Sequence, residues 1–373
     1  MKKIFITAIL SLYLIADVEA QNNKPNEKNN FPDVTIFEDA IGHFNDSLAL
    51  KFKFERYKQT QVKEIAWNLV KYQNKDGGWP KNIDWLAIIE PDSVKNLLSA
   101  LYKTSTLDNR NTYSQAEYLA QAYLITKEEK FRKSSERAID FVLNTQKSSG
   151  GWRGWDVDAI TYNDEVMTGA MKLLLDIKEE KEYFWWINKE RKLKAEAALQ
   201  KAIDITLKCQ IVVDGNKTGW GQQHDHNTLQ AVKARAYELP GISSLESAAI
   251  VKFLMLIKNP SPEIISAINS AVDWMQKSKL YEIRIVADKE DSLKTFYNSR
   301  RPDRKLIKDE TAPPIWARYY EIETNRPFFC NRDGIKVYSL SEVLPERRRG
   351  YAWYGYWPSD VLNLHTKWKK NLK

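Results

Sequence analysis

Hydrophobic positions along the chain recur mostly at the spacing of a helix. Val62, Ile65 and Leu69 fall on one helical face, and Ala138 and Val142 do so in a later stretch. The residues between them are largely polar. Both stretches therefore predict amphipathic helices that lie at the outside of the protein.

Other stretches are apolar on most sides. They read "YLAQAYLI", "VMTGAMKLLLDI" and "SAAIVKFLMLI". A helix that is apolar nearly all round is buried between neighbours. Outer and inner helices are thus expected to alternate along the chain.

A repeat connects these helices. The segments "LVKYQNKDGGWPK", "FVLNTQKSSGGWRG" and "TLKCQIVVDGNKTGWGQQ" each end a helical stretch with glutamine, followed by a polar turn and Gly-Trp. The tryptophans are Trp79, Trp152 and Trp220, which lie 73 and 68 residues apart. We interpret them as packing caps at helix ends. A degraded fourth copy is expected at "VDWMQKSKLYEI", with Trp274 and Gln276 but no Gly-Trp.

Helical hairpins with a period near 70 residues predict a mainly α fold. The class is an α/α toroid, an incomplete barrel of helical hairpins, with long loops and a few short strands forming a cleft. The stretches "YEIRIVA" and "GIKVYSL" are the candidate strands. We predict a signal peptide over residues 1–20, a flexible leader over 21–50 and a single toroid domain over 51–373.

The first twenty residues, "MKKIFITAILSLYLIADVEA", combine a basic start, a short apolar core and small residues before a cleavage site after Ala20. This pattern predicts secretion or transfer to a periplasm. No later run reaches about 18 apolar residues, so no membrane span is expected in the mature chain. The following "QNNKPNEKNNFPD" is polar, as a flexible leader would be.

The chain is basic, with 57 Lys and Arg against 49 Asp and Glu. A secreted basic protein has less reason to bind nucleic acid than an anionic polymer, and acidic polysaccharide is the natural candidate. Charge alone fits simple solubility equally well. Cys209 and Cys330 could pair, but one bridge is no disulfide framework. We expect a monomer.

Polar residues gather just before the inner helices, in "STLDNRNTYSQAEYLAQAY", "AITYNDEVMTGAM" and "KARAYELPGISSLES". On one side of a toroid such segments face a common cleft, so we expect these residues to converge: Asp108, Asn109, Asn163, Asp164 and Arg235. Two aspartates with amide neighbours suit Ca²⁺. Each aspartate taken singly is better explained as a helix N-cap, whereas the set together favours a site.

Other chemistry is sparse in the sequence. There is no Gly-x-Ser-x-Gly elbow, P-loop or dinucleotide fingerprint. His224 and His226 could bind a metal, but no third ligand is evident. The C-terminal third places Arg318, Arg332 and Arg347 among aromatic residues. Arginine forks match carboxylates, although at least half of the arginines there are expected to be structural.

Several blocks together resemble a known family. They are "STLDN", "ITYND", "HDxxTLQ", "ARAYELPxxSxxES", "PPIWARYYEIxTNRPxFxxRDG" and "ERRxGYAWYG". They look like the pectate lyases of polysaccharide lyase family 10, and the resemblance covers roughly residues 55 to 360. It implies a helical toroid-like fold that cleaves polygalacturonate by Ca²⁺-assisted β-elimination and yields 4,5-unsaturated oligogalacturonides.

The resemblance also implies roles for individual residues. Asp108 and Asp164 correspond to calcium ligands, and Arg235 to the catalytic base. Substrate carboxylates would be bound by arginines, and further contacts would come from one amide and one more arginine; these residues are Arg318 and Arg332, then Asn109 and Arg347.

Two departures concern the substrate subsites. The segment "GGWRGWDVDAITYND" is shorter than is usual in the family, with Arg153 where the family has proline. Lys233 replaces the tryptophan that usually precedes "ARAYE". The catalytic set is intact, whereas the subsites and the preferred chain length need not follow the family.

The chemistry leaves alternatives open. Arginine is almost always protonated in water, so Arg235 can act as a base only if burial and nearby cations favour its neutral form, or if proton transfer is concerted with departure of the leaving group. An inverting glycoside hydrolase would instead use Asp108 and Asp164 as a carboxyl pair roughly 6.5–9.5 Å apart. A non-catalytic protein that binds acidic glycan is the third reading.

Overall fold

The computed structural model describes residues 31–47, 54–89, 103–288 and 302–372, and Pro32–Lys373 form one compact unit. The α-helices described are α1 Glu38–Ser47, α2 Val62–Tyr72, α4 Tyr113–Thr126, α5 Glu129–Thr145, α6 Val166–Lys178, α7 Lys189–Lys208, α8 Ser244–Leu254, α9 Pro262–Lys277, α10 Pro345–Gly350 and α11 Trp357–Asn371. The 3-10 helices are η1 Thr35–Phe37, η2 Asn163–Glu165, η3 Glu182–Phe184 and η4 Leu340–Glu342. None of the helices in this part of the chain has the length and apolarity needed to cross a membrane.

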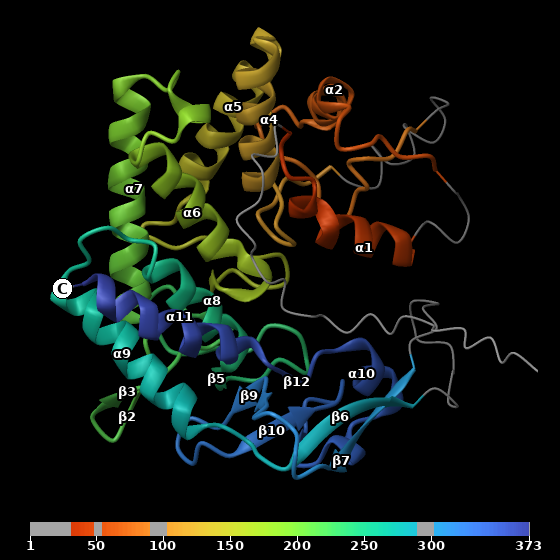
Figure 1. Cartoon of the computed structure of the whole chain (residues 1–373), viewed down its shortest axis with the longest axis vertical. Coiled ribbons are helices and arrows are strands. Elements are labelled where there is room, and N and C mark those ends of the chain that lie inside the picture. Colours follow the sequence, from red (N-terminus) through yellow and green to blue (C-terminus); the bar gives the residue numbers. More distant parts are fainter. Residues whose placement is uncertain (1–30, 48–53, 90–102, 289–301, 373) are drawn as a thin grey trace, which may run out of the picture. The chain divides into compact units, whose positions relative to one another are not determined.

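Helices pack in sequential pairs. α4 lies against α5, α6 against α7 and α8 against α9, while α11 covers α8 and α9 (Figure 1). α2, α5 and α9 bury one face, whereas α4, α6 and α8 bury most of their residues. The predicted alternation of outer and inner helices and the mainly α class are confirmed, and the stacked pairs are consistent with a toroid.

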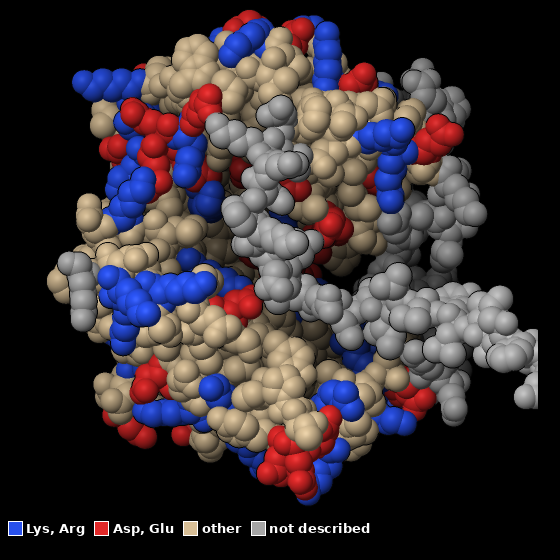
Figure 2. All heavy atoms as spheres, in the orientation of Figure 1, with Lys and Arg blue, Asp and Glu red and all other residues tan. Residues whose placement is uncertain are grey.

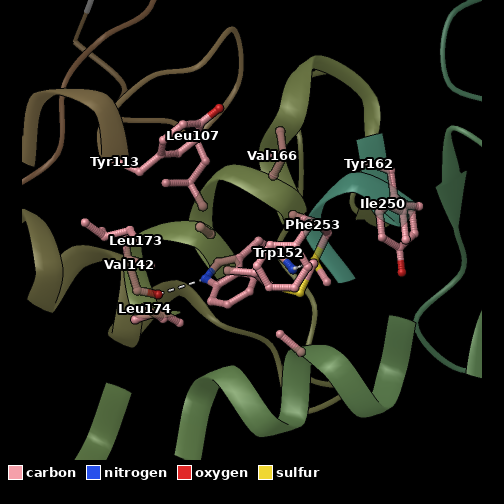
Figure 3. Packing of buried hydrophobic residues seen from close by; sticks show 14 of the residues in the cluster. Leu107, Tyr113, Val142, Trp152, Tyr162, Val166, Leu173, Leu174, Ile250 and Phe253 are labelled. Carbon is pink, nitrogen blue, oxygen red and sulfur yellow. Dashed lines mark hydrogen bonds between the residues drawn. The ribbon is translucent and has the colours of Figure 1, made fainter. Parts of the chain in front are cut away.

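Each repeated tryptophan caps the outer helix that precedes it. Each indole Nε1 donates a hydrogen bond to a carbonyl in the last turn of the helix before it, at 2.7–2.8 Å. The bond from Trp152 to Val142 is visible among the packed side chains in Figure 3. All three indoles are at most 1% exposed. They therefore satisfy carbonyls that the helix itself leaves unpaired, as predicted for helix caps.

The repeated glutamines connect one repeat to the next. Gln146 at the end of α5 donates to Ala198 O in α7 at 2.8 Å. Gln73 and Gln210 make the same bond to α5 and α9; their acceptors are Ser134 O and Ala267 O. Each outer helix is thus fixed against the following outer helix through one amide group.

Glycine is required where the turn meets the next helix. Gly150 has a φ of +96°, and a Cβ there would lie 2.5 Å from Lys201 O in α7. The turn therefore lies directly on the backbone of the next repeat, and no side chain fits between them.

The fourth copy is capped differently. Trp274 Nε1 donates to the Asn325 side chain at 2.8 Å and not to a carbonyl in the last turn of a helix. The carbonyl of Met275 accepts instead from Trp316 Nε1, at 2.8 Å. The cap of α9 is thus supplied from a strand far along the chain.

The short strands form small antiparallel sheets among the loops. The described strands are β1 Ile160–Thr161, β2 Val212–Val213, β3 Asn216–Lys217, β4 Gln223–His224, β5 Ile242–Ser243, β6 Ile283–Asp288, β7 Asp303–Lys308, β8 Trp316–Ala317, β9 Tyr319–Tyr320, β10 Pro327–Cys330, β11 Lys336–Val337 and β12 Tyr354–Gly355. The largest has the order β11-β10-β9-β5, and β6 pairs with β7. Both predicted strand stretches are confirmed, in β6 and β11.

The leader predicted over residues 21–50 is wrong for its second half. Residues 35–47 form η1 and α1, and Phe37, Ala40 and Phe44 are at most 3% exposed within the main hydrophobic core. Asp33 accepts hydrogen bonds from the backbone and hydroxyl of Thr35, which starts the helix. The polar residues before residue 31 favoured a flexible leader, so the amphipathic helix that follows them was not predicted. The predicted signal peptide lies outside the described residues.

The two cysteines are both free thiols and both buried. Cys209 follows α7, and Cys330 ends β10. The pairing that the sequence left open is not formed.

Two glycine substitutions test this packing. Gly42→Ala in α1 meets no atom within 4 Å, so it should raise the free energy of unfolding by about 0.5–1 kcal/mol through helix propensity. Gly169→Ala in α6 would place a Cβ 2.0 Å from the buried ring of Tyr113, so it should lower that energy by about 1–3 kcal/mol. Urea unfolding measures both. An unchanged midpoint for Gly42→Ala would mean that residues 38–47 are not helical in solution.

Candidate active site

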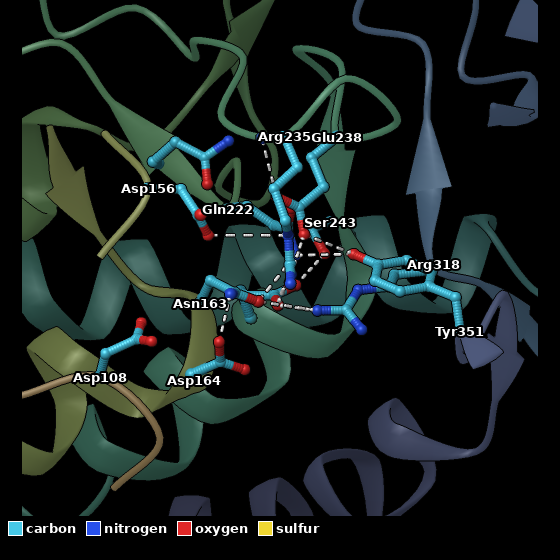
Figure 4. A network of polar contacts seen from close by, with 12 residues as sticks. Asp108, Asp156, Asn163, Asp164, Gln222, Arg235, Glu238, Ser243, Arg318 and Tyr351 are labelled. Carbon is cyan, nitrogen blue, oxygen red and sulfur yellow. Dashed lines mark hydrogen bonds and ion pairs between the residues drawn. The ribbon is translucent and has the colours of Figure 1, made fainter. Parts of the chain in front are cut away.

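Strand pairing brings the predicted site segments together. β1 pairs with β4, which sets the segment of Asn163 beside the one that leads to Arg235. β5 pairs with β9, so Ser243 lies opposite Tyr319, next to Arg318. Figure 4 shows these side chains with Asp108 and Asp164 in one region.

Neither aspartate caps a helix. Thr112 is the N-cap residue of α4 and Glu165 that of α6, and neither position has a side-chain capping bond. The N-cap reading of Asp108 and Asp164 is therefore wrong.

The backbone is left-handed at Asp164 and at Asn109, the residue after Asp108. Asn109 has a φ of +55° and Asp164 a φ of +50°. Non-glycine residues held in this region cost energy and gather at functional sites. Both aspartate segments thus carry conformations that helix formation does not need.

The two aspartates act on one another electrostatically. Asp108 is 4% exposed, and its Oδ2 accepts a hydrogen bond from Lys81 Nζ at 2.6 Å. Asp164 Oδ2 accepts from the Asn163 amide at 2.6 Å. Burial and then the charge of Asp108 raise the pKa of Asp164 to about 7, against the opposing charges of Arg235 and Arg318. The charges of Asp108, Arg235 and Arg318 therefore all act on Asp164, as expected if these four predicted residues lie close together.

Arg235 is held by a carboxylate. Its backbone N–H donates to Glu238 Oε2 at 3.1 Å, and its Nη2 donates to Glu238 Oε1. Its Nε lies 3.8 Å from Asp156 Oδ2, and its guanidinium lies 5.3 Å from the ring centre of Tyr237. Burial lowers the pKa of Arg235, but the hydrogen bond and charge of Glu238 outweigh it and raise that pKa above its ordinary range. Arg235 is a cation here.

Sequence reasoning missed Glu238. This residue is 1% exposed and also accepts a hydrogen bond from the Tyr351 hydroxyl at 3.1 Å. Burial raises the pKa of Glu238, but Arg235 lowers it further, so the net shift is downward. The signal was present, because Glu238 stands three residues after Arg235 within "ARAYELP", the spacing of one turn.

A second buried ion pair holds Arg318. Its Nη2 donates to Glu246 Oε1 at 2.7 Å and to Asn163 Oδ1 at 3.0 Å. Gln222 donates to the same Asn163 oxygen at 2.8 Å. Because that oxygen is occupied twice, the Asn163 amide N–H₂ faces Asp164. Burial lowers the pKa of Arg318, and Glu246 more than restores it.

Both site arginines keep an unused donor. Nε of Arg235 and Nε of Arg318 are buried and have no hydrogen-bond partner among the described residues. Buried unpaired donors are costly, so such groups mark places where a ligand supplies the acceptor.

Arg332 and Arg347 lie near the same tyrosine ring that Arg235 contacts. Their guanidinium groups lie 5.5 and 4.6 Å from the centre of the Tyr237 ring, which Arg235 also contacts. Both arginines donate to the carboxylate of Glu346, at 2.5–3.1 Å. Burial raises the pKa of Glu346, but these arginines lower it to about 2. Arg332 and Arg347 thus already bind one carboxylate, which belongs to Glu346 of the same chain.

Asn109 and His224 are both buried and hydrogen-bonded within the chain. Asn109 is 5% exposed and donates to Asn82 Oδ1 at 2.6 Å. His224 is fully buried: its Nδ1 lies 2.8 Å from Leu229 O, and Gly221 N–H donates to its Nε2 at 2.9 Å. Within the described ranges no group of three His, Cys, Asp or Glu side chains could hold a metal. The histidine metal site is therefore not formed.

Comparison with known proteins decides the family. The profile of the family described as pectic acid lyase matches residues 73–362. The chain belongs to the pectic acid lyase family. The match starts at Gln73, the glutamine of the first repeat, and contains every site residue described above. The enzyme class predicted from the sequence, a pectate lyase, is confirmed.

Solved structures agree with this assignment. The chain is similar to the family 10 polysaccharide lyase of Cellvibrio cellulosa, with a TM-score of 0.70 and 26% identity over 91% of this chain and 98% of that one. An aspartate-to-alanine mutant of that lyase in complex with trigalacturonic acid gives a TM-score of 0.71 and 26% identity over 90% and 99% of the two chains. A search of curated protein sequences returns no match.

The basic excess of this pectic acid lyase does not gather around the site on the face that Figure 2 shows. On the face shown in Figure 2, basic and acidic side chains are intermingled over the whole surface. The basic excess therefore does not form one cationic field there. Selection of an acidic ligand must come from the paired charges of the site.

The pH dependence of folding should report on His224. Burial lowers its pKa to about 4, whereas an unfolded histidine has a pKa of about 6.5. Between these values the unfolded chain binds a proton that the folded chain does not, so stability falls as pH falls. His224 alone should contribute a loss of about 2 kcal/mol between pH 7.5 and 5, and the raised pKa of Asp164 opposes this loss in the wild-type protein.

Urea unfolding at several pH values measures this loss. His224→Gln should reduce the slope of stability against pH in this range, because glutamine can accept from Gly221 N–H without titrating. The control is His43→Gln, whose side chain is 51% exposed on α1. Equal slopes for the His224→Gln and wild-type proteins would contradict the assignment.

Proposed function

We propose that this protein cleaves polygalacturonate, or a closely related acidic polysaccharide, by calcium-assisted β-elimination that leaves 4,5-unsaturated oligogalacturonides. The observation that carries the proposal is the convergence of two mutually repelling carboxylates, Asp108 and Asp164, with the half-buried Arg235 and the buried Arg318. The trigalacturonic acid bound by the similar Cellvibrio lyase supports the class of substrate.

The residues present fit a calcium ion held together with substrate. Asp108 and Asp164 offer carboxylate oxygens, the hard ligands that Ca²⁺ takes. The pKa of Asp164 is raised by burial and by the nearby charge of Asp108, which Arg235 and Arg318 offset only in part. Two side chains do not fill the six to eight positions of this ion. The substrate carboxylate and water would complete the set.

Bound calcium would withdraw charge from the C6 carboxylate of the uronate and make its C5 proton more acidic. The protein residues orient the sugar. Arg318 is fixed by Glu246 and presents its unused Nε, and Arg332 and Arg347 recognise neighbouring carboxylates beyond Tyr237. Asn109 contacts the substrate at the Asp108 side.

Arg235 takes the C5 proton in this proposal. The C5–H bond breaks as the N–H bond forms, the electron pair makes the C4=C5 double bond, and the C4–O4 bond breaks. O4 takes a proton from water, and Arg235 returns its own to solvent. A guanidinium must first be neutral, and Glu238 opposes this. Glu238 therefore sets how alkaline the solution must be for turnover.

The cellular setting follows from the substrate. Polymeric pectate lies outside the cell, which agrees with a signal peptide over residues 1–20, cleaved after Ala20, and with secretion or release to a periplasm. A monomer is sufficient, because all proposed site residues belong to one chain.

The first test is an assay on polygalacturonate, with added Ca²⁺ and with chelator. We expect the ultraviolet absorbance of the double bond conjugated to the carboxylate to rise, and chelator to abolish it. New reducing ends without that absorbance would indicate an inverting hydrolase. Binding of the polymer with no product at all would indicate a glycan-binding protein.

The second test addresses the base. Arg235→Ala should lower kcat by about 10²-fold or more in a protein that still folds and binds calcium, although loss of the ion pair with the buried Glu238 lowers its stability. Arg235→Lys keeps a charge but loses the planar fork and should stay impaired. Near-native turnover of Arg235→Ala would remove Arg235 from the base role.

Glu238→Gln separates a base from a fixed cation. Removing the carboxylate charge leaves the burial that lowers the pKa of Arg235, so the rising limb of kcat against pH should move to lower pH. A limb that stays in place or moves to higher pH would mean that Arg235 acts while protonated.

A further inference from the structure

A second hollow lies beside the proposed active site. Its volume is about 590 Å³, within the usual range for small-ligand pockets. Three segments line it: residues 104–107, the end of α5 with residues 141 and 144–147, and residues 152–155. None of the residues described so far as site residues lines it.

Both walls of this cavity continue into the active site. Leu107 in one wall directly precedes Asp108. Trp155 in the other directly precedes Asp156, whose Oδ2 lies 3.8 Å from Arg235 Nε. A polymer that occupies the site therefore has an adjoining space to enter.

Trp155 is a large aromatic residue in this wall. Its side chain is 43% exposed, although its ring is large and apolar. Lys81 Nζ lies 4.5 Å from the ring centre and also binds Asp108. Lys81 does not line the cavity, so it covers one side of the ring and leaves another side to the cavity.

The loop that carries Trp155 is fixed. Gly154 N–H donates to Thr161 Oγ1 at 2.9 Å, and Arg153 donates to Gly154 O and to Trp155 O at 3.1 and 3.2 Å. A Cβ on Gly154 would lie 2.7 Å from Thr161 Cγ2. An exposed aromatic ring held on a rigid loop is preorganised for contact with a ligand.

The lining has the chemistry of an acidic sugar site. Beside Trp155 the lining combines six residues that carry hydroxyl or amide groups with the apolar Leu107, Phe141 and Trp152; Arg153 and Lys147 are its cations, and no carboxylate lines it. The other cavity that meets the site, about 420 Å³ beside Asp164, is lined by five carboxylates: Glu38, Asp39, Asp164, Glu165 and Glu246. An anionic chain is repelled from that cavity and is accepted by the one at Trp155.

We propose that the Trp155 cavity is a subsite for the galacturonate units next to the reacting one, with the ring of Trp155 stacked on a sugar face and Arg153 directed to a carboxylate. The inference rests on the proposed function and extends it to substrate length: chains long enough to reach Trp155 bind more tightly than chains that fill only the reaction site.

The test is the affinity of Arg235→Ala protein, which should not turn over, for hexagalacturonate and digalacturonate, measured by calorimetry. Adding Trp155→Ala should weaken hexamer binding by roughly tenfold and dimer binding much less. Trp155→Phe should retain most of the affinity. Trp185→Ala is the control, because Trp185 is 60% exposed and does not line the cavity.

Charge recognition is tested in the same background. Arg153→Gln should reduce the preference for hexagalacturonate over its methyl ester. If Trp155→Ala weakened hexamer and dimer equally, Trp155 would act through Lys81 and Asp108, and the subsite would be disproved. In that case the ratio of the affinities for hexamer and dimer would be unchanged.

Failure of the proposed function looks different. In that case the wild-type protein gives no unsaturated product, whether or not the Arg235→Ala protein binds the oligomers. Product formation by the wild type together with an unaltered Trp155→Ala variant removes only the subsite.

Discussion

The fold depends on a single amide group in each repeat. The glutamine that ends one outer helix donates to a carbonyl of the next outer helix, and in the first two repeats a glycine four residues later, Gly77 or Gly150, lets the two backbones meet. This contact fixes the distance and the rotation between successive helical pairs. Once the pairs are in register, the segments before the inner helices have to lie on the same side. The convergence of Asp108, Asp164 and Arg235 is thus a consequence of helix stacking.

The site itself is built at an energetic cost. Glu238, Glu246 and Arg318 are all nearly buried, and buried ion pairs seldom stabilise a protein more than apolar residues of the same volume would. What they provide is orientation. Glu246 fixes Arg318, Arg318 fixes the Asn163 amide, and that amide faces Asp164. The buried charges place donors and carboxylates where an ionic substrate and a cation could use them.

The sequence predicted the helices, the repeat and the positions of the site because each depends on local periodicity. Trp152 could be interpreted as a cap from its place after a helix, and Arg235 from its place before one. Glu238 and Lys81 were missed, since their importance arises from burial and from contact across the fold. α1 was missed for the opposite reason, because a polar neighbouring segment concealed a short amphipathic one.

The two cavities bear on the direction of the substrate. A polyuronate carries one negative charge on each sugar, so its path must avoid carboxylates except where a cation bridges them. The Asp164 cavity presents carboxylates on every side, with only Arg110 among its lining residues to offset them. The Trp155 cavity presents cations and hydroxyls, and Arg332 and Arg347 lie against the Tyr237 ring that Arg235 also contacts. A chain laid from Trp155 past Arg235 towards Tyr237 keeps positive or neutral groups beside its outer sugars. It passes Asp156, which lies beside Arg235, and meets Asp108 and Asp164 at the reacting unit, where the proposed calcium ion would hold both sets of charges.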